Sequence, residues 1–320
     1  MTNQLKEHWV QWRHHLHEHP ELGFNEKKTA NFVIKILNQY GIETYSEIGQ
    51  TGVVGILKRG NSKKSIGIRA DMDALPINES NEFKYRSRYK NRFHGCGHDG
   101  HTVMLLAAAE KLASTDKIDG TVYFIFQPNE ENGLGATAMI EDGLFERFHI
   151  DAVYGMHNMP GMSLGTIAVR KGVMMAFEDN FVINILGSGG HSSMPHRCKD
   201  PVVVGAELIN ALQTVVSRCI DPLDSAVISV TEILSDGARN IIPSNVTIKG
   251  DIRGFSKSTQ DIIEKRIKTL VVNIARAHDL KININYTKEF TMLENSDRET
   301  DIAIKAAIDV VGNDNIILNY

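Results

Sequence analysis

The chain has 320 residues, of which 42% are hydrophobic and 23% charged, with a formal net charge of −4. This balance is typical of a globular protein large enough for two domains, and the slight acidity argues against a basic nucleic-acid-binding surface. The three cysteines are too few for a disulfide framework, and the polar N-terminus resembles neither a signal peptide nor a membrane span. We therefore expect a cytoplasmic protein with neither nucleic-acid nor membrane partners.

The first part of the chain, residues 1–178, alternates helical and strand-like patterns. Apolar spacing predicts helices, and short apolar runs predict buried strands. The expected helices are 4–19, 26–40, 102–115 and 134–142, and the expected strands are 52–57, 66–70, 121–126 and 152–156. Such alternation indicates an α/β domain with a mostly parallel sheet covered on both faces.

Residues 179–288 follow a different order. Strands are predicted at 180–187, 226–233, 245–253 and 281–287, with helices at 201–218 and 257–278. This β-α-β-β-α-β order predicts an inserted ferredoxin-like α+β domain. Residues 289–320 then return to the first domain, with a helix at 297–311 and a strand that begins at "NIILNY".

Reactive side chains follow three of the strands in the first domain. Asp71 and Asp73 follow strand 66–70, the pair Glu130-Glu131 follows strand 121–126, and His157 follows strand 152–156. Because ligands bind at the carboxyl ends of strands in α/β sheets, we expect these groups at one edge. Taken singly, each has a simpler reading as a turn residue, a solvated pair or a structural histidine.

The octapeptide "HGCGHDGH" (94–101) has two readings. It is either a polar turn that happens to be rich in histidine, or the first half of a metal site. It precedes a predicted helix, whose N-terminus would favour a thiolate at Cys96. Thiolate, imidazole and carboxylate ligands suit Zn²⁺, Mn²⁺, Co²⁺ or Ni²⁺ better than Mg²⁺ or Ca²⁺. Metal-activated water with a glutamate base would hydrolyse an amide or ester.

A second histidine-rich stretch, "HHLHEHPE" (14–21), lies in the first predicted helix. At 100° per residue its four histidines point to different faces, so they cannot bind one ion together. It is also not an H-E-x-x-H motif, because position 21 is Glu. We interpret His14, His15, His17 and His19 as surface groups or as groups that support a site without binding metal.

Three polar residues stand out in the inserted domain. His191 lies in the glycine-rich stretch "GSGGHSSMPH", where a simple loop is the alternative reading. Asn240 and Arg253 lie beside predicted strands. Arg253 could hold a substrate carboxylate with two hydrogen bonds, or it could pair with Asp251.

Together these stretches resemble the hippurate hydrolase and N-acyl-amino-acid amidohydrolase family, dinuclear metallopeptidase relatives of aminoacylase and glutamate carboxypeptidase. The resemblance runs from residue 13 to about 255 and is carried by "RHHLHEHPELGFNE", "IRADMDALP", "HGCGHDGH", "FQPNEE", "GMHNMP", "GSGGHSSMPH" and "NIIPSNVTIKGDIRGF". It implies a zinc-exopeptidase α/β domain with a ferredoxin-like dimerisation domain. It also implies a homodimer with two divalent metal ions per subunit.

The resemblance also assigns roles to individual residues. The implied metal ligands are Cys96, His98, Glu131 and His157. Glu130 would be the general base and Asp73 the acid that orients the site. His191, from the partner subunit's small domain, would stabilise the oxyanion, while Asn240 and Arg253 would hold the polar end of the substrate.

The C-terminal part departs from the family pattern. The family's catalytic domain continues past the equivalent of Tyr320 and supplies one more histidine ligand, whereas this sequence has no histidine after His278. We therefore expect a chain that is C-terminally truncated relative to the family. Three functions stay open: an N-acyl-amino-acid amidohydrolase, a non-catalytic metal-binding or dimerising homologue, and a dipeptidase or carboxypeptidase of the same superfamily.

Overall fold

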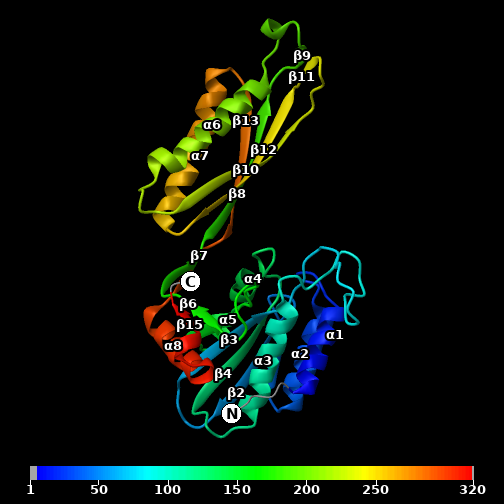
Figure 1. The fold of residues 1–320 in the computed structure, drawn as a ribbon, viewed down its shortest axis with the longest axis vertical. Helices are drawn as coiled ribbons and strands as arrows, with labels where there is room; N and C mark the ends of the chain where they lie inside the picture. Colours follow the sequence, from blue (N-terminus) through cyan, green and yellow to red (C-terminus); the bar gives the residue numbers. More distant parts are fainter. Residues whose placement is uncertain (1–5, 319–320) are drawn as a thin grey trace. The chain divides into compact units, whose positions relative to one another are not determined.

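The computed structural model describes residues 6–318. The chain divides into two compact units, Met1–Met162 and Ser163–Tyr320 (Figure 1). The predicted division at 178 and 288 stays a prediction, and the two units are described separately below.

The first unit is built on a five-stranded sheet with the strand order β1-β2-β4-β3-β5. β3 pairs in parallel with β4 and β5, whereas β2 is antiparallel to β1 and β4. The elements in chain order are α1 (Glu7–Glu18), α2 (Lys27–Gln39), β1 (Glu43–Ile48), β2 (Gly52–Arg59), β3 (Ser65–Asp71), α3 (His98–Ala113), β4 (Gly120–Gln127), α4 (Gly135–Glu141), α5 (Leu144–Arg147) and β5 (Ala152–Gly155). The α/β class and the predicted helices and strands of this unit are confirmed.

Two cores lie on the two faces of this sheet, because successive side chains of a strand point to opposite faces. From β4, Phe124 and Phe126 pack with α2 and α3, while Tyr123 and Ile125 pack with α4 and α5. The central strand is therefore apolar on both faces, which is why it reads as a continuous apolar run. The parallel strands β4, β3 and β5 end at one edge, and this edge carries the reactive residues.

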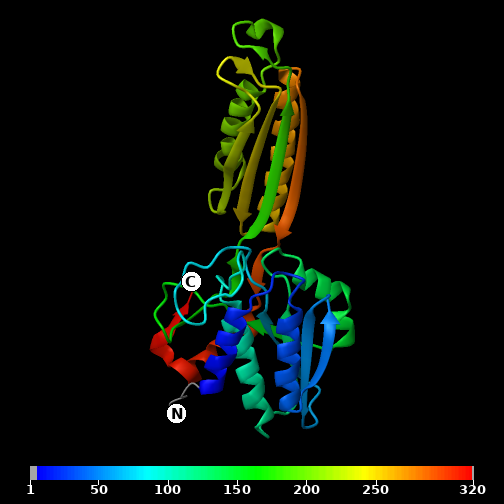
Figure 2. The same ribbon diagram turned by 90° about the vertical axis from the view of Figure 1, so that its right-hand side faces the viewer.

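The second unit contains a four-stranded antiparallel sheet with the order β10-β12-β8-β13. Its elements are β8 (Phe177–Leu186), α6 (Pro201–Cys219), β10 (Ala226–Ser235), β12 (Asn245–Gly254), α7 (Lys257–Ala277) and β13 (Lys281–Phe290). α6 and α7 lie side by side on one face of this sheet (Figure 2). The predicted β-α-β-β-α-β order is confirmed.

The core of the second unit explains the apolar character of α6. This helix has the length and composition of a membrane span, but Val204, Leu208, Leu212 and Val215 are buried in the core against the sheet and α7. Alternate residues of β8 are buried on the same face. α6 is thus one of the two core helices of this unit.

Short elements complete the second unit. They are β6 (Ile167–Val169), β7 (Gly172–Met175), β9 (Gly190–His191), η1 (Pro195–Arg197), β11 (Ile241–Ile242), β14 (Leu293–Asn295), α8 (Asp297–Val311), η2 (Asn313–Asn315) and β15 (Ile316–Leu318). β9 pairs with β11, β7 with β14, and β15 in parallel with β6. The predicted helix 297–311 and the strand that follows it are confirmed.

Candidate metal centre

The ends of β3, β4 and β5 bring the predicted residues of the first unit together around His98. The Nε2 atom of His98 lies 3.8 Å from a carboxylate oxygen of Glu130 and 3.8 Å from one of Glu131. The candidate ligand atoms of Cys96, His98 and His157 lie within 4.8 Å of one another. The expectation that the three strand ends deliver their side chains to one edge is confirmed.

The turn before α3 depends on a glycine. Gly97, at the N-cap of α3, has a φ of +89°, in the left-handed region. A Cβ at this position would lie 2.4 Å from Oδ1 of Asn158. α3 begins at His98, four residues earlier than predicted, so His98 lies in the first turn of the helix.

Asp73 holds two of the predicted site residues at once. Its Oδ1 lies 3.2 Å from Nδ1 of His98, and its Oδ2 accepts the N–H of Glu131 at 3.0 Å. In a neutral imidazole that donates from Nδ1 to Asp73, the acceptor is Nε2, which faces the glutamates. This arrangement supports the orienting role expected for Asp73.

The donor set fits a divalent cation. Nε2 of His98 and Oε1 of Glu131 are buried and have no hydrogen-bond partner within the described part of the chain. Buried polar atoms are normally satisfied, so an unpaired nitrogen and an unpaired oxygen facing one space point to a missing ligand. Cys96, on the same edge, adds the sulfur that Zn²⁺, Co²⁺ and Ni²⁺ accept.

The protonation of Cys96 differs from the expectation. Burial, together with the charges of Glu131, Glu130 and Asp71, raises the pKa of the Cys96 thiol to about 12. The predicted thiolate is therefore wrong for the metal-free protein, because desolvation and three nearby acids outweigh the helix N-terminus. Burial also raises the pKa of Glu131, with the neighbouring Glu130 and Asp73 adding to it. A cation at this place would reverse both effects.

Sequence reasoning missed the roles of Asp71 and His101. Burial would raise the pKa of Asp71, but the hydrogen bond from Nδ1 of His101 at 2.7 Å and the charge of Arg69 hold it well below its usual range. His101 also accepts the N–H of Asn158 at its Nε2. Both ring nitrogens are thus engaged, and the side chain supports the site. The signal was available, since residues three apart share one face of a helix, as His98 and His101 do.

The histidine-rich helix α1 contributes one buried group. His17 lies 2.9 Å from Asp99 and 3.1 Å from Glu79, and these two carboxylates raise its pKa against the opposing effect of burial. His14, His15 and His19 are exposed or half-buried. The four histidines do not share one site, as expected.

The predicted residues of the second unit are not all brought together. His191 and Asn240 lie at the β9–β11 pair, where the carbonyl of Asn240 accepts the N–H of Ser192. Arg253 lies near the other end of β12, about 26 Å along the strand from Asn245 at ~3.3 Å per residue. The roles of all three residues stay predictions.

The guanidinium of Arg253 is already paired. It lies 2.8 Å from Glu178 and 3.0 Å from Asp251, so the alternative reading of an ion pair describes its state here. A substrate carboxylate at this place would have to compete with these two acids.

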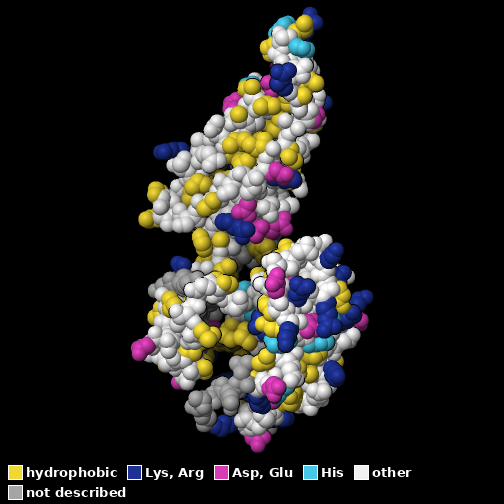
Figure 3. Space-filling model, turned by 45° about the vertical axis from the view of Figure 1, so that its right-hand side comes forward, with side chains coloured by type: hydrophobic (Ala, Val, Ile, Leu, Met, Phe, Trp, Pro, Cys, Tyr) yellow, Lys and Arg dark blue, Asp and Glu magenta, His cyan; other side chains and the backbone are white. Residues whose placement is uncertain are grey.

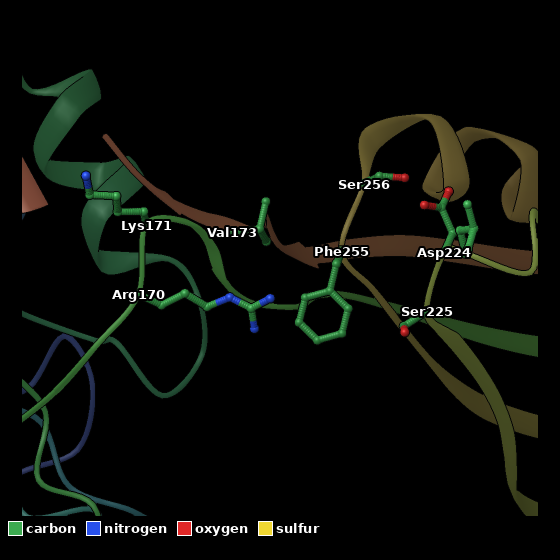
Figure 4. Close-up of a pocket in the computed structure, with 8 residues that line it drawn as sticks. Arg170, Lys171, Val173, Asp224, Ser225, Phe255 and Ser256 are labelled. Carbon is green, nitrogen blue, oxygen red and sulfur yellow. The ribbon is translucent and has the colours of Figure 1, made fainter. Parts of the chain in front are cut away.

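The second unit also contains a pocket lined by residues 170–173, 223–225 and 255–256. It has a volume of about 470 Å³, and Figure 4 shows the Arg170 side chain reaching toward the Phe255 ring, with Asp224 and Ser256 nearby. None of the predicted site residues lines it. We therefore assign the chemistry to the edge of the five-stranded sheet and not to this cavity.

Comparison with known proteins identifies the family. Residues 67–319 match the model of peptidase family M20/M25/M40. The chain is 46% identical over 308 residues to the hippurate hydrolase of Campylobacter jejuni, covering 96% of this chain and 80% of that protein. It is 38% identical over 312 residues to the N-acetyl-L-cysteine deacetylase of Bacillus subtilis, covering 96% and 74% of the two chains.

A solved structure agrees with the fold. The Bacillus subtilis YXEP protein, described as a dinuclear metal-binding peptidase of the M20 family, superimposes with a TM-score of 0.80 at 31% identity. The match covers 94% of this chain and 79% of that one. The chain belongs to peptidase family M20/M25/M40 and is a metal-dependent hydrolase of amide bonds.

Proposed function

We propose that this protein hydrolyses the amide bond of N-acyl-amino acids, hippurate-like compounds among them. The observation that carries the proposal is the free Nε2 of His98 facing the adjacent Glu130 and Glu131. The substrate class is supported by the hippurate hydrolase and by the N-acyl-L-amino acid amidohydrolase of Geobacillus stearothermophilus, which are 46% and 37% identical to this chain.

The proposed metal ligands are Cys96, His98, Glu131 and His157, holding two ions drawn from Zn, Mn, Co or Ni. Ions bound there would polarise the amide carbonyl and lower the pKa of water. Within the protein, Asp73 holds the imidazole of His98 and the backbone of Glu131 in place.

Glu130 is the proposed general base. Its side chain is 32% exposed, whereas that of its neighbour Glu131 is 16% exposed, so Glu130 is the more open to substrate and water. It would take the proton of the attacking water and pass it to the nitrogen of the leaving amine. Such a group contributes about 10²- to 10⁴-fold to the rate.

His191 would stabilise the oxyanion from the partner subunit. Asn240 and Arg253 would hold the polar end of the substrate, and because they lie at opposite ends of β12 they would do so from different subunits. We therefore propose a homodimer. The edge strand β10 and the outer face of α6 support it, since both expose apolar side chains, with Val203 58% and Ile233 58% exposed. Figure 3 shows apolar side chains at the surface of this unit. Light scattering of the purified protein tests the dimer. The cytoplasmic location, tested by cell fractionation, stays a prediction.

The test of the proposed function joins metal analysis to turnover. The protein is purified, its metal content is measured, and hydrolysis of hippurate and of a dipeptide is followed with added Mn²⁺, Co²⁺ or Zn²⁺. Glu130→Gln should lower turnover of hippurate by at least 100-fold while the metal content stays at about two ions per chain. Faster cleavage of the dipeptide would favour a peptidase. Two bound ions without any turnover would favour the non-catalytic homologue.

A further inference from the structure

The C-terminal turn of α1 and the segment between α1 and α2 contact three of the four segments that carry the metal centre, and each contact falls one residue from a site residue. The carbonyl of Glu21 accepts the N–H of Ala74 at 2.9 Å, next to Asp73. His17 contacts Asp99, next to His98. A carboxylate oxygen of Glu26 accepts the N–H of Asn129, next to Glu130.

Glu26 is the most deeply buried of these contacts. It is 0% exposed, and both of its oxygens are engaged. Oε1 accepts the N–H of Asn129 at 2.8 Å, and Oε2 accepts the hydroxyl of Thr51 at 2.6 Å. Burial raises the pKa of Glu26. A carboxyl group with two fixed partners and no solvent contact is a rigid support.

Asn129 needs such a support. Its φ of +44° lies in the left-handed region, which non-glycine residues seldom adopt unless their surroundings hold them there. Its carbonyl accepts the N–H of Gly135 at 3.0 Å. Its side chain lies against Gly23, where a Cβ would come within 1.8 Å of Oδ1 of Asn129. The turn is therefore fixed on several sides immediately before Glu130.

We propose that Glu26 is a positioning residue for Glu130, acting through the backbone of Asn129. The hydrogen bond holds the left-handed turn at Asn129, and this turn sets the direction in which Glu130 and Glu131 leave the end of β4. The inference rests on the proposed role of Glu130 as the general base. It assigns a function to the stretch "HPELGFNE" (19–26), which contains no metal ligand: its last residue, Glu26, positions the general base.

Three variants of the full-length protein test the proposal. Glu26→Met fills the same space and removes both acceptors. Glu26→Gln keeps one oxygen for the Asn129 N–H, while its amide can donate to the Thr51 hydroxyl, which can also act as an acceptor. Thr51→Val is the matched control, since it removes the other hydrogen bond of Glu26 and leaves the Asn129 contact in place.

The measurements are kcat and KM for hippurate, Zn²⁺ content, thermal midpoint, and hydrogen exchange at the amides of residues 129–133 in the metal-free protein. Glu26→Met should lower kcat by about 10- to 100-fold, with KM changed less than threefold, because a displaced catalytic group costs rate more than binding. Exchange at residues 129–133 should become faster. Glu26→Gln and Thr51→Val should keep kcat within threefold of the wild type.

The outcomes separate this inference from the proposed function. If Glu130→Gln abolishes turnover but Glu26→Met behaves as Thr51→Val does, Glu26 has only a structural role and the inference is wrong. If Glu130→Gln leaves turnover intact, Glu130 is not the general base, and the proposed function is wrong whatever the Glu26 variants show. Should Glu26→Met not fold, Glu26→Asp replaces it, since the shorter carboxylate withdraws from Asn129. A normal kcat and normal amide exchange in Glu26→Asp would then overturn the inference.

Discussion

Replacing Asp73 by Asn tests whether this side chain controls metal binding. Asp73 is 1% exposed, and its two oxygens accept from Nδ1 of His98 and from the N–H of Glu131. Asn has nearly the same shape but only one acceptor oxygen. In either orientation its amide group therefore faces a donor, and one of the two contacts is lost.

The size of the effect follows from the burial. A buried donor left without a partner costs about 1–3 kcal/mol, and about 1.4 kcal/mol corresponds to a factor of ten in affinity. Loss of a partner that orients a metal-binding histidine typically costs about 10- to 100-fold in affinity. We expect Asp73→Asn to weaken Zn²⁺ binding by about 10- to 100-fold.

Competition with a chromophoric chelator measures this affinity directly, without reference to turnover. Asp179→Asn is the matched control, because Asp179 is also buried and accepts two side-chain hydrogen bonds, from Gln260 and Tyr286. Its Zn²⁺ affinity should equal that of the wild type. Zn²⁺ affinity of Asp73→Asn within threefold of the wild type would refute the reasoning.

Three further predictions concern single groups. In the metal-free protein, alkylation of Cys96 should speed up about tenfold per pH unit from pH 8 to 10 without a plateau, since its pKa is about 12; a plateau near pH 9 would contradict this. Ile248→Ala, in the core of the second unit, should lower the free energy of unfolding in urea by about 2–5 kcal/mol, and a loss below ~1 kcal/mol would show a looser core. Hydrogen bonds from Lys6, His8 and Trp9 outweigh the effect of burial and lower the pKa of Glu110 to about 2, below its unfolded value. The contribution of Glu110 to the free energy of unfolding is therefore present above about pH 4.5 and lost as the pH falls toward 2. Glu110→Gln should lower the free energy of unfolding by about 1–2 kcal/mol at pH 7 and make it depend less on pH between about 4.5 and 2. An acid-unfolding profile equal to that of the wild type would contradict this.

Local pattern was sufficient for most of the fold. Amphipathic spacing identified the helices, and the apolar run of β4 identified a strand buried on both faces. β1 was missed because its sequence, "ETYSEI", is mostly polar. β1 is an outermost strand of the sheet, and its exposed positions show little alternation of apolar and polar residues. The predicted start of α3 was late because His98 and Asp99 are buried despite their polarity.

The sequence by itself determined that acids and histidines would meet at one sheet edge, since parallel strands deliver their carboxyl ends to the same side. Only the tertiary structure decided what each group does there. Burial, together with the charges of Glu131, Glu130 and Asp71, raises the pKa of the Cys96 thiol. Glu26 reaches Asn129 across 103 positions of the chain. Such contacts depend on how distant segments pack, and no local periodicity encodes them.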